Sequence, residues 1–401
     1  MARYCVENRL NYYANKDVMV PNRDILAALA IEQTGLSDFG ETWFFDNIDV
    51  LIPSLNSQAQ LSDAGVYGAQ TMIVSGLVNR LRHIELIKRN PEIMDEQVNV
   101  KAVLTGLPRT GSTMLHRMLA AAPKLTGVRW YEAQNYVPLP NEERGNPAPR
   151  KDAAQGILDY MLQAIPELMS IHPMSIDQPD EEVIILGQLF SSSMIESTYY
   201  VPDYAAWLSG QDPRPAYDDL VTILRSLQWQ DPSRKGKNWV LKTPGHLMAL
   251  ETVLDVFPEA KIIMTHRDPI STIPSYCSME ASLYKMGSDT ISNQMIGAYW
   301  FERLYEWLES FMTARARADA SRFMDINYQD MLTDPIAVGR QVLDFSAIGY
   351  SAEIDAGMSG WIEANKREHR AAHKYSLDDF SLTPGQIRTR YKTYTETFIQ
   401  D

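Results

Sequence analysis

The segment Gly106-Leu107-Pro108-Arg109-Thr110-Gly111-Ser112-Thr113 lies between a β-branched run and an apolar helical pattern. The run before it, residues 98–106, predicts a buried strand, and the pattern after it predicts a helix over residues 112–122. A strand, a glycine-containing loop and a helix in this order bind anions, because the glycines let backbone amides face inward and the helix N-terminus adds positive potential. The segment therefore predicts a site for a phosphate-like anion.

This loop has the spacing of the GxxxxGK[ST] phosphate-binding loop with one departure, because Ser112 stands where the lysine is expected. That lysine reaches the β- and γ-phosphates of a nucleotide, so its absence argues against nucleoside triphosphate hydrolysis. Arg109 supplies a cation from inside the loop instead. The alternative is a glycine-rich strand-to-helix turn that binds no ligand.

Three further short apolar runs predict strands at residues 239–242, 261–265 and 322–328, with helical patterns at 246–257, 269–283 and 292–318. Alternating strands and helices predict an α/β fold of the P-loop type, a three-layer arrangement with a central parallel sheet covered on both faces. A mostly helical insertion occupies about 150–230, and a last helix is expected near Thr383-Pro384.

The chain divides into two predicted parts. Residues 1–98 carry helical spacing, most clearly from Gln70 to Ile93, and are expected to pack on the core as a helical N-terminal part. Residues 99–401 are expected to form the α/β domain with its insertion.

Composition limits the partners of this 401-residue chain, whose formal net charge is −14. Such an acidic protein is a poor candidate for nucleic-acid binding. Its two cysteines, Cys5 and Cys277, make no disulfide framework, and no Cys/His cluster predicts a metal site. No apolar run reaches the length of a membrane span and the first residues lack a secretory pattern, so a cytoplasmic protein is expected, with a homodimer left open.

A second anion site is predicted after the strand at 261–265. Arg267 stands at the carboxyl end of that strand, where ligands bind in open parallel sheets, and Ser275 follows about two helical turns later. Together they could hold a second phosphate. The alternative is an ordinary salt-bridged arginine.

Three motifs in order carry a resemblance to a known family. They are Gly106 to Thr113, Leu241-Lys242-Thr243-Pro244-Gly245-His246-Leu247 and His266-Arg267-Asp268-Pro269. The chain resembles the sulfotransferase superfamily, which uses 3′-phosphoadenosine 5′-phosphosulfate, and most closely its bacterial branch. The resemblance runs from about Val100 to Leu377, and no motif covers the residues before it.

The resemblance implies a set of donor-binding residues. The first loop would cradle the 5′-phosphosulfate, the Arg267 and Ser275 pair would hold the 3′-phosphate, and a basic C-terminal loop would close over the nucleotide. The residues concerned are Pro108, Arg109, Thr110, Gly111, Ser112, Thr113, Arg267, Ser275, Lys366, Arg367, His373 and Tyr375.

The resemblance also implies the chemistry, an in-line transfer of a sulfuryl group to a hydroxyl of a small-molecule, lipid or glycan acceptor without a metal. Arg109 and Lys242 are the expected cations for the leaving oxygen. His246 is the first candidate for the general base, Glu132 is its rival, and Glu181 is a third candidate in an acidic cluster that a helix N-terminus alone would explain. The competing functions are a P-loop kinase-like phosphotransferase and a non-catalytic nucleotide-binding protein.

Overall fold

The structure, a computed structural model, describes residues 19–365 and 375–399. Its centre is a five-stranded parallel sheet with the strand order β2-β3-β1-β4-β5. The strands are β1 (Asn99–Thr105), β2 (Leu125–Thr126), β3 (Asn238–Lys242), β4 (Lys261–His266) and β5 (Phe323–Asn327). The predicted parallel sheet is confirmed.

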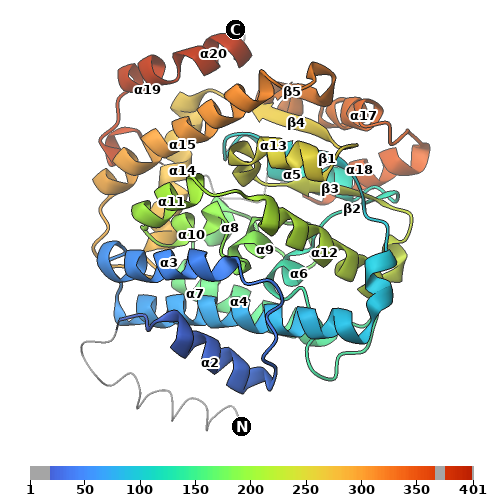
Figure 1. The fold of residues 1–401 in the computed structure, drawn as a ribbon. Helices are drawn as coiled ribbons and strands as arrows, with labels where there is room; N and C mark the ends of the chain where they lie inside the picture. The colour runs from blue at the N-terminus through green and yellow to red at the C-terminus, as the bar shows by residue number, and fades with distance from the viewer. Residues whose placement is uncertain (1–18, 366–374, 400–401) are drawn as a thin grey trace.

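Helices cover both faces of the sheet, so the domain has three layers (Figure 1). Successive strand residues point to opposite faces, and Val103 of β1 therefore joins one core while its neighbours Ala102 and Leu104 join the other. On the Val103 side lie α12 (Arg214–Gln230), α13 (Leu250–Val256), α14 (Pro269–Tyr284), α15 (Asn293–Arg315), α19 (Pro384–Arg390) and α20 (Lys392–Phe398). On the other side lie α5 (Ser112–Ala120), α16 (Tyr328–Thr333), α17 (Pro335–Phe345) and α18 (Ala352–Ala364).

The N-terminal helices lie at the opposite end of the molecule from α19 and α20 (Figure 1). They are α2 (Arg23–Thr34), α3 (Phe44–Gln58) and α4 (Asp63–Arg89), followed by the 3₁₀ turn η1 (Pro91–Asp95). Their core includes Phe190, Tyr199 and Tyr204 from the insertion, so this part packs against the rest of the chain. The backbone amide of Ser62 also donates a hydrogen bond of 2.9 Å to the carbonyl of Gly287.

The predicted insertion is helical and lies between the N-terminal helices and the sheet (Figure 1). Besides α12 it contains α7 (Ala148–Ala164), α8 (Leu168–Ile171), α9 (Val183–Gln188), α10 (Ser193–Thr198) and α11 (Pro202–Ser209), and the short α6 (Trp130–Gln134) precedes it. The remaining 3₁₀ turns are η2 (Pro232–Arg234), η3 (Pro244–Met248), η4 (Ala320–Arg322) and η6 (Asp378–Phe380).

Two local expectations differ from the structure. The predicted helix over 246–257 is divided into η3 and α13, because Pro244 starts a 3₁₀ turn and Ala249 leaves helical geometry between the two elements. The strand β2 was not predicted, because its two residues carry no alternating pattern.

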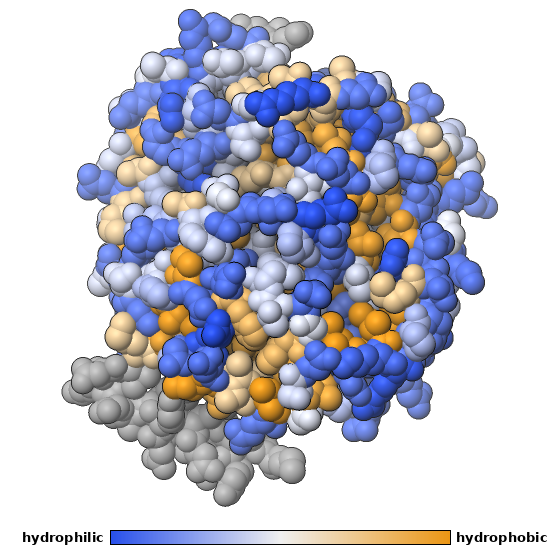
Figure 2. All heavy atoms as spheres, in the orientation of Figure 1, coloured by the Kyte–Doolittle hydropathy of each residue, from blue (hydrophilic) through white to orange (hydrophobic). Residues whose placement is uncertain are grey.

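Much of the surface in Figure 2 is hydrophilic, with apolar groups interspersed. None of the helices within residues 19–365 and 375–399 is long and apolar enough to cross a membrane.

The contact between α4 and the turn after α14 gives a test of how the N-terminal part is held. A Cβ added at Gly65 would lie 1.9 Å from the carbonyl oxygen of Gly287, so we expect Gly65→Ala to lower the free energy of unfolding by about 1–3 kcal/mol. Gly156 in α7 has nothing within 4 Å of such a Cβ, so the control Gly156→Ala should stabilise by about 0.5–1 kcal/mol. Denaturant unfolding measures both, and equal effects would contradict this docking.

Candidate active site

The predicted anion loop connects β1 to α5 and is held against the end of β4. Gly106 has a φ of +133°, and a Cβ there would lie 2.5 Å from the carbonyl oxygen of Thr265. The Thr110 hydroxyl lies 2.7 Å from the Leu107 carbonyl and 2.6 Å from the Thr265 hydroxyl. These contacts fix the curvature of the loop without any ligand.

The N-terminus of α5 follows the loop directly. Gly111 is the N-cap residue with a φ of +88°, and no side chain caps the helix. The amides of Met114 and Leu115 donate to the Gly111 carbonyl, whereas those of Ser112 and Thr113 precede the first helical hydrogen bonds and lie at the positive end of the helix dipole. This end of α5 is therefore suited to an anionic group.

An ammonium reaches the loop from the neighbouring strand. Lys242 ends β3, and its Nζ donates a hydrogen bond of 2.8 Å to the Thr113 hydroxyl while its side chain is only 2% exposed. The same Nζ also contacts the Glu181 carboxylate. The fold thus brings a cation to a loop that has a serine at the usual lysine position.

The acidic cluster before α9 consists of Asp177, Asp180, Glu181 and Glu182, and the last two contact this lysine. α9 begins at Val183, and its N-cap residue Glu182 makes no capping hydrogen bond with its side chain. Asp180 instead pairs with Arg117 at 2.9 Å and accepts the Glu181 amide at 2.8 Å. The side chains of Asp180 and Glu182 therefore have partners beyond the N-terminus of α9.

Glu181 is the more accessible of the two carboxylates that contact Lys242, with 17% of its side chain exposed against 1% for Glu182. Burial raises the pKa of Glu181 above its ordinary value, against the lowering effect of Lys242, while the negative charges of Asp180 and Glu182 raise it further. A partly exposed carboxylate with a raised pKa beside an anion loop is suited to proton transfer.

His246 lies in η3 and is 1% exposed. Its Nε2 is 2.5 Å from Glu182 Oε1 and its Nδ1 is 2.7 Å from the hydroxyl of Tyr217. Both ring nitrogens are thus occupied by buried groups.

Glu132, the second base candidate, lies in a buried ion-pair cluster at α6. Its carboxylate accepts hydrogen bonds from Arg234 at 2.7 Å, from the Arg129 amide at 2.8 Å and from the Tyr131 hydroxyl at 3.1 Å. The Glu132 carboxylate therefore already has three hydrogen-bond donors within the protein.

The two predicted anion sites are adjacent. The Arg109 Nε donates to the Ser275 hydroxyl at 3.0 Å, and Arg267 Nη1 donates to the Arg109 carbonyl at 3.0 Å. The Arg267 guanidinium also lies 4.3 Å from the centre of the Tyr328 ring. Arg109, which was expected at the leaving oxygen, therefore lies between the two sites, with its Nη1 donating to the Ile171 carbonyl at 2.9 Å.

The predicted C-terminal donor contacts fall mostly outside the described residues, which include neither Lys366, Arg367 nor His373. Tyr375 follows that stretch and is half-buried. Among the described residues, no group of three or more His, Cys, Asp or Glu side chains is placed to hold a metal ion.

Sequence reasoning missed the residues that support the site, namely Glu182, Asp180, Arg117, Tyr217 and Tyr328. Glu182 and Asp180 lie in the acidic cluster that the sequence did single out, but their partners are more than fifty positions away in the chain. A local sequence pattern cannot reveal hydrogen bonds and ion pairs between residues that lie so far apart in the sequence.

The chain is similar to known proteins along most of its length. A sequence model described as the sulfotransferase family matches residues 102–352. The omega-hydroxy-beta-dihydromenaquinone-9 sulfotransferases Stf3 of Mycobacterium bovis and Mycobacterium tuberculosis are 24% identical over 267 residues. That match covers 61% of this chain and 62% of each relative, so it spans less than two thirds of their length.

Two solved structures are similar over nearly the whole chain. The sulfotransferase STF1 of Mycobacterium tuberculosis H37Rv is 29% identical with a TM-score of 0.81, covering 93% of this chain and 99% of that one. The sulfotransferase STF9 of Mycobacterium avium is 24% identical with a TM-score of 0.85, covering 97% and 99%, and supports the fold. With the family match extending from β1 past β5, this chain belongs to the sulfotransferase family.

Proposed function

We propose that this protein transfers a sulfuryl group from 3′-phosphoadenosine 5′-phosphosulfate to a hydroxyl of its acceptor. The observation that carries the proposal is the hydrogen bond from the Lys242 ammonium to Thr113 of the anion loop, beside the partly exposed Glu181 carboxylate. A cation, a helix N-terminus and a base together meet the needs of group transfer from an anionic donor.

The residues present fit this donor at two points. The loop from Pro108 to Thr113, with the first amides of α5, would hold the 5′-phosphosulfate. Arg267 and Ser275 would hold the 3′-phosphate, since Arg267 follows the carboxyl end of β4, Ser275 lies in the adjoining α14, and both contact Arg109. Lys366, Arg367, His373 and Tyr375 remain predicted contacts to the same nucleotide.

Each step of the transfer has a residue to support it. The acceptor oxygen attacks the sulfur, the bond from sulfur to the bridging oxygen breaks, and the acceptor proton passes to Glu181. The Lys242 ammonium stabilises the charge that builds on the leaving oxygen, and Arg109 adds a second cation near the loop. No step in this sequence uses a metal ion.

A lipid hydroxyl is the first acceptor class to test, because the Stf3 relatives are named for a hydroxylated dihydromenaquinone. Small molecules and glycans with hydroxyl groups complete the acceptor classes that we propose.

The function itself is tested by donor binding and by transfer. We expect 3′-phosphoadenosine 5′-phosphate to bind in isothermal titration without magnesium and more tightly than magnesium-ATP. Radiolabelled donor should then pass sulfate to an acceptor in a screen of hydroxylated lipids, glycans and small molecules. Preference for magnesium-ATP would indicate a kinase-like phosphotransferase, and binding without transfer would indicate a non-catalytic nucleotide-binding protein.

The proposed 3′-phosphate contact predicts the effect of removing Arg267. Arg267→Ala should weaken binding of 3′-phosphoadenosine 5′-phosphate by about 10- to 100-fold, the loss expected for one charged hydrogen bond. Turnover at saturating donor should change little. Arg144→Ala is a matched control, because Arg144 also stacks on an aromatic ring, at 4.0 Å from Trp229, but lies outside the site. Unchanged affinity in Arg267→Ala would contradict this contact.

The base assignment predicts a pH effect. A base must be deprotonated to act and the pKa of Glu181 is raised, so turnover should fall with decreasing pH at a midpoint above the ordinary glutamate value of about 4.3. Glu181→Gln should lower kcat by about 10²- to 10⁴-fold and abolish this fall in turnover at low pH, which is the acidic limb of the pH profile. Glu167→Gln, an exposed glutamate at the start of α8, is the control. Full turnover in Glu181→Gln would return the role to His246 or Glu132.

A further inference from the structure

A buried chain of side chains extends from α12 to the end of β3. The Tyr217 hydroxyl lies 2.7 Å from His246 Nδ1, His246 Nε2 lies 2.5 Å from Glu182 Oε1, and Glu182 Oε2 accepts the Lys242 amide at 3.0 Å. The members of this chain are at most 3% exposed. This hydrogen-bonded chain therefore ends at the backbone amide of Lys242, and the ammonium of the same residue contacts the anion loop.

The chemistry of the partners sets the direction of these hydrogen bonds. Burial works against ionisation of Glu182, but the hydrogen bond from His246 and the amide of Lys242 outweigh it and lower the pKa of Glu182 below its ordinary value. An ionised carboxylate only accepts hydrogen bonds, so His246 Nε2 carries a proton. Burial raises the pKa of Tyr217, so the phenol keeps its proton, and its hydroxyl can donate a hydrogen bond to Nδ1 in the tautomer that carries its proton on Nε2.

The pairing of the strands explains why the Lys242 amide needs an acceptor from this hydrogen-bonded chain of side chains. β2 pairs with β3 only at Asn238 and Trp239, so no strand continues along this edge as far as Lys242. On the other edge the following residue, Thr243, donates its amide to Leu104 of β1. Glu182 accepts the Lys242 amide in place of a strand neighbour, and a buried amide must be satisfied in this way.

We propose that His246 is a positioning residue, which together with Tyr217 holds Glu182 against the end of β3 and so keeps the Lys242 ammonium between Glu181 and Thr113. The inference deepens the proposed function and rests on it for the catalytic meaning of Lys242. It also replaces the sequence-based role of His246 as the general base.

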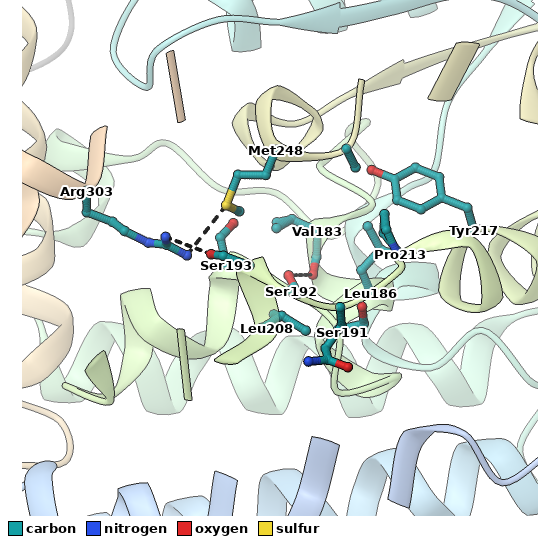
Figure 3. Close-up of a pocket in the computed structure, with 14 residues that line it drawn as sticks. Val183, Leu186, Ser191, Ser192, Ser193, Leu208, Pro213, Tyr217, Met248 and Arg303 are labelled. Atoms are coloured by element: carbon teal, nitrogen blue, oxygen red, sulfur yellow. Dashed lines mark hydrogen bonds between the residues drawn. The ribbon is translucent and has the colours of Figure 1, made fainter. Parts of the chain in front are cut away.

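The position of His246 argues against direct contact with an acceptor. The His246 ring is buried, and Glu182 lies between it and Lys242 in the hydrogen-bonded chain. Beyond Tyr217 lies a different cavity of about 70 Å³, bordered by Tyr217 from α12, Met248 from η3 and Arg303 from α15 (Figure 3). Tyr217 lies in α12 and borders this cavity, so removal of its hydroxyl need not distort the sheet.

Two substitutions of His246 separate positioning from proton transfer. A glutamine amide can donate to Glu182 as Nε2 does but cannot act as a base, whereas leucine leaves the buried Glu182 Oε1 without that donor. We expect His246→Leu to lower kcat by about 10- to 100-fold, the range for losing a partner that orients a functional ligand, and His246→Gln to recover most of that loss. A general base would lose about 10²- to 10⁴-fold in both variants.

The acidic limb of the pH profile gives a readout that a merely structural residue would not change. Glu181 is faced by Lys242 from β3 and by Asp180 and Glu182 from its own segment, and of these Lys242 lowers its pKa. If the ammonium moves away in His246→Leu, the pKa of Glu181 rises and the limb shifts to higher pH. In His246→Gln the acidic limb should stay at the same pH, whereas substitution of a general base would abolish it.

The assay uses radiolabelled 3′-phosphoadenosine 5′-phosphosulfate with water as the acceptor, so that no acceptor need be identified. Tyr217→Phe removes only the hydroxyl and should lower turnover, while Tyr204→Phe, whose hydroxyl donates to the Phe190 carbonyl away from the site, should not. His83→Gln is the matched histidine control, since His83 is buried and bonded to Ser226. Thermal unfolding confirms that each variant is folded.

Crystal structures of His246→Gln and His246→Leu complete the test independently of turnover. We expect the hydrogen bond of 2.8 Å from Lys242 Nζ to Thr113 Oγ1 to persist in the glutamine variant and to be lost in the leucine variant. An unmoved ammonium in His246→Leu would overturn the inference, as would equal loss of turnover in both variants. If even the unsubstituted protein transfers no sulfate, the proposed function fails, and the crystal comparison still decides the positioning role.

Discussion

The burial of the Lys242 ammonium is the constraint on which the site depends. A cation with 2% of its side chain exposed is costly to remove from water unless opposite charge and hydrogen bonds compensate it. Glu181 supplies the charge, Thr113 supplies a hydroxyl, and Glu182 fixes the backbone that carries the lysine. Glu181 and Glu182 come from the insertion, so the helical layer and the sheet must dock before the site exists. The same docking leaves Glu181 as the more accessible of the two carboxylates that contact Lys242.

The anion loop and the second cation site form one continuous surface at the carboxyl end of the sheet. Arg109 contacts Ser275 through its side chain and Arg267 through its carbonyl, while Tyr328 from the end of β5 supports the Arg267 guanidinium. Residues that follow three adjacent strands, β1, β4 and β5, therefore meet at one edge of the sheet, and two of them, Arg109 and Arg267, are cations in a protein of net charge −14. A ligand with anionic groups at two ends suits such an edge, and the proposed donor, which the resemblance to sulfotransferases implies, is a ligand of this kind.

Much of the fold could be predicted, because its signals are local. The glycines at 106 and 111, the β-branched strands and the proline-capped α14 report their own conformations, and they placed four of the five strands and the helices after them. The failures have physical causes. β2 is too short to carry a period, and the division between η3 and α13 lies at Ala249, whose backbone leaves helical geometry although its sequence neighbours keep the helical pattern. In the site, the sequence drew attention to Lys242, Arg267 and Glu181 but ranked His246 and Glu132 above Glu181 as bases. That ranking followed residue chemistry without knowledge of burial or partners.

The amino-acid sequence by itself determined where the anion loop lies, which strands precede the cations and which family the motifs resemble. These properties depend on residues that are neighbours in the chain, so periodicity, glycine positions and short motifs report them. Only the tertiary structure decided that Glu132 pairs with Arg234, that His246 is enclosed between Tyr217 and Glu182, and that Glu181 meets Lys242. The physical reason is that the pairing and solvation of a charge depend on groups from distant segments, which come together when the insertion packs on the sheet.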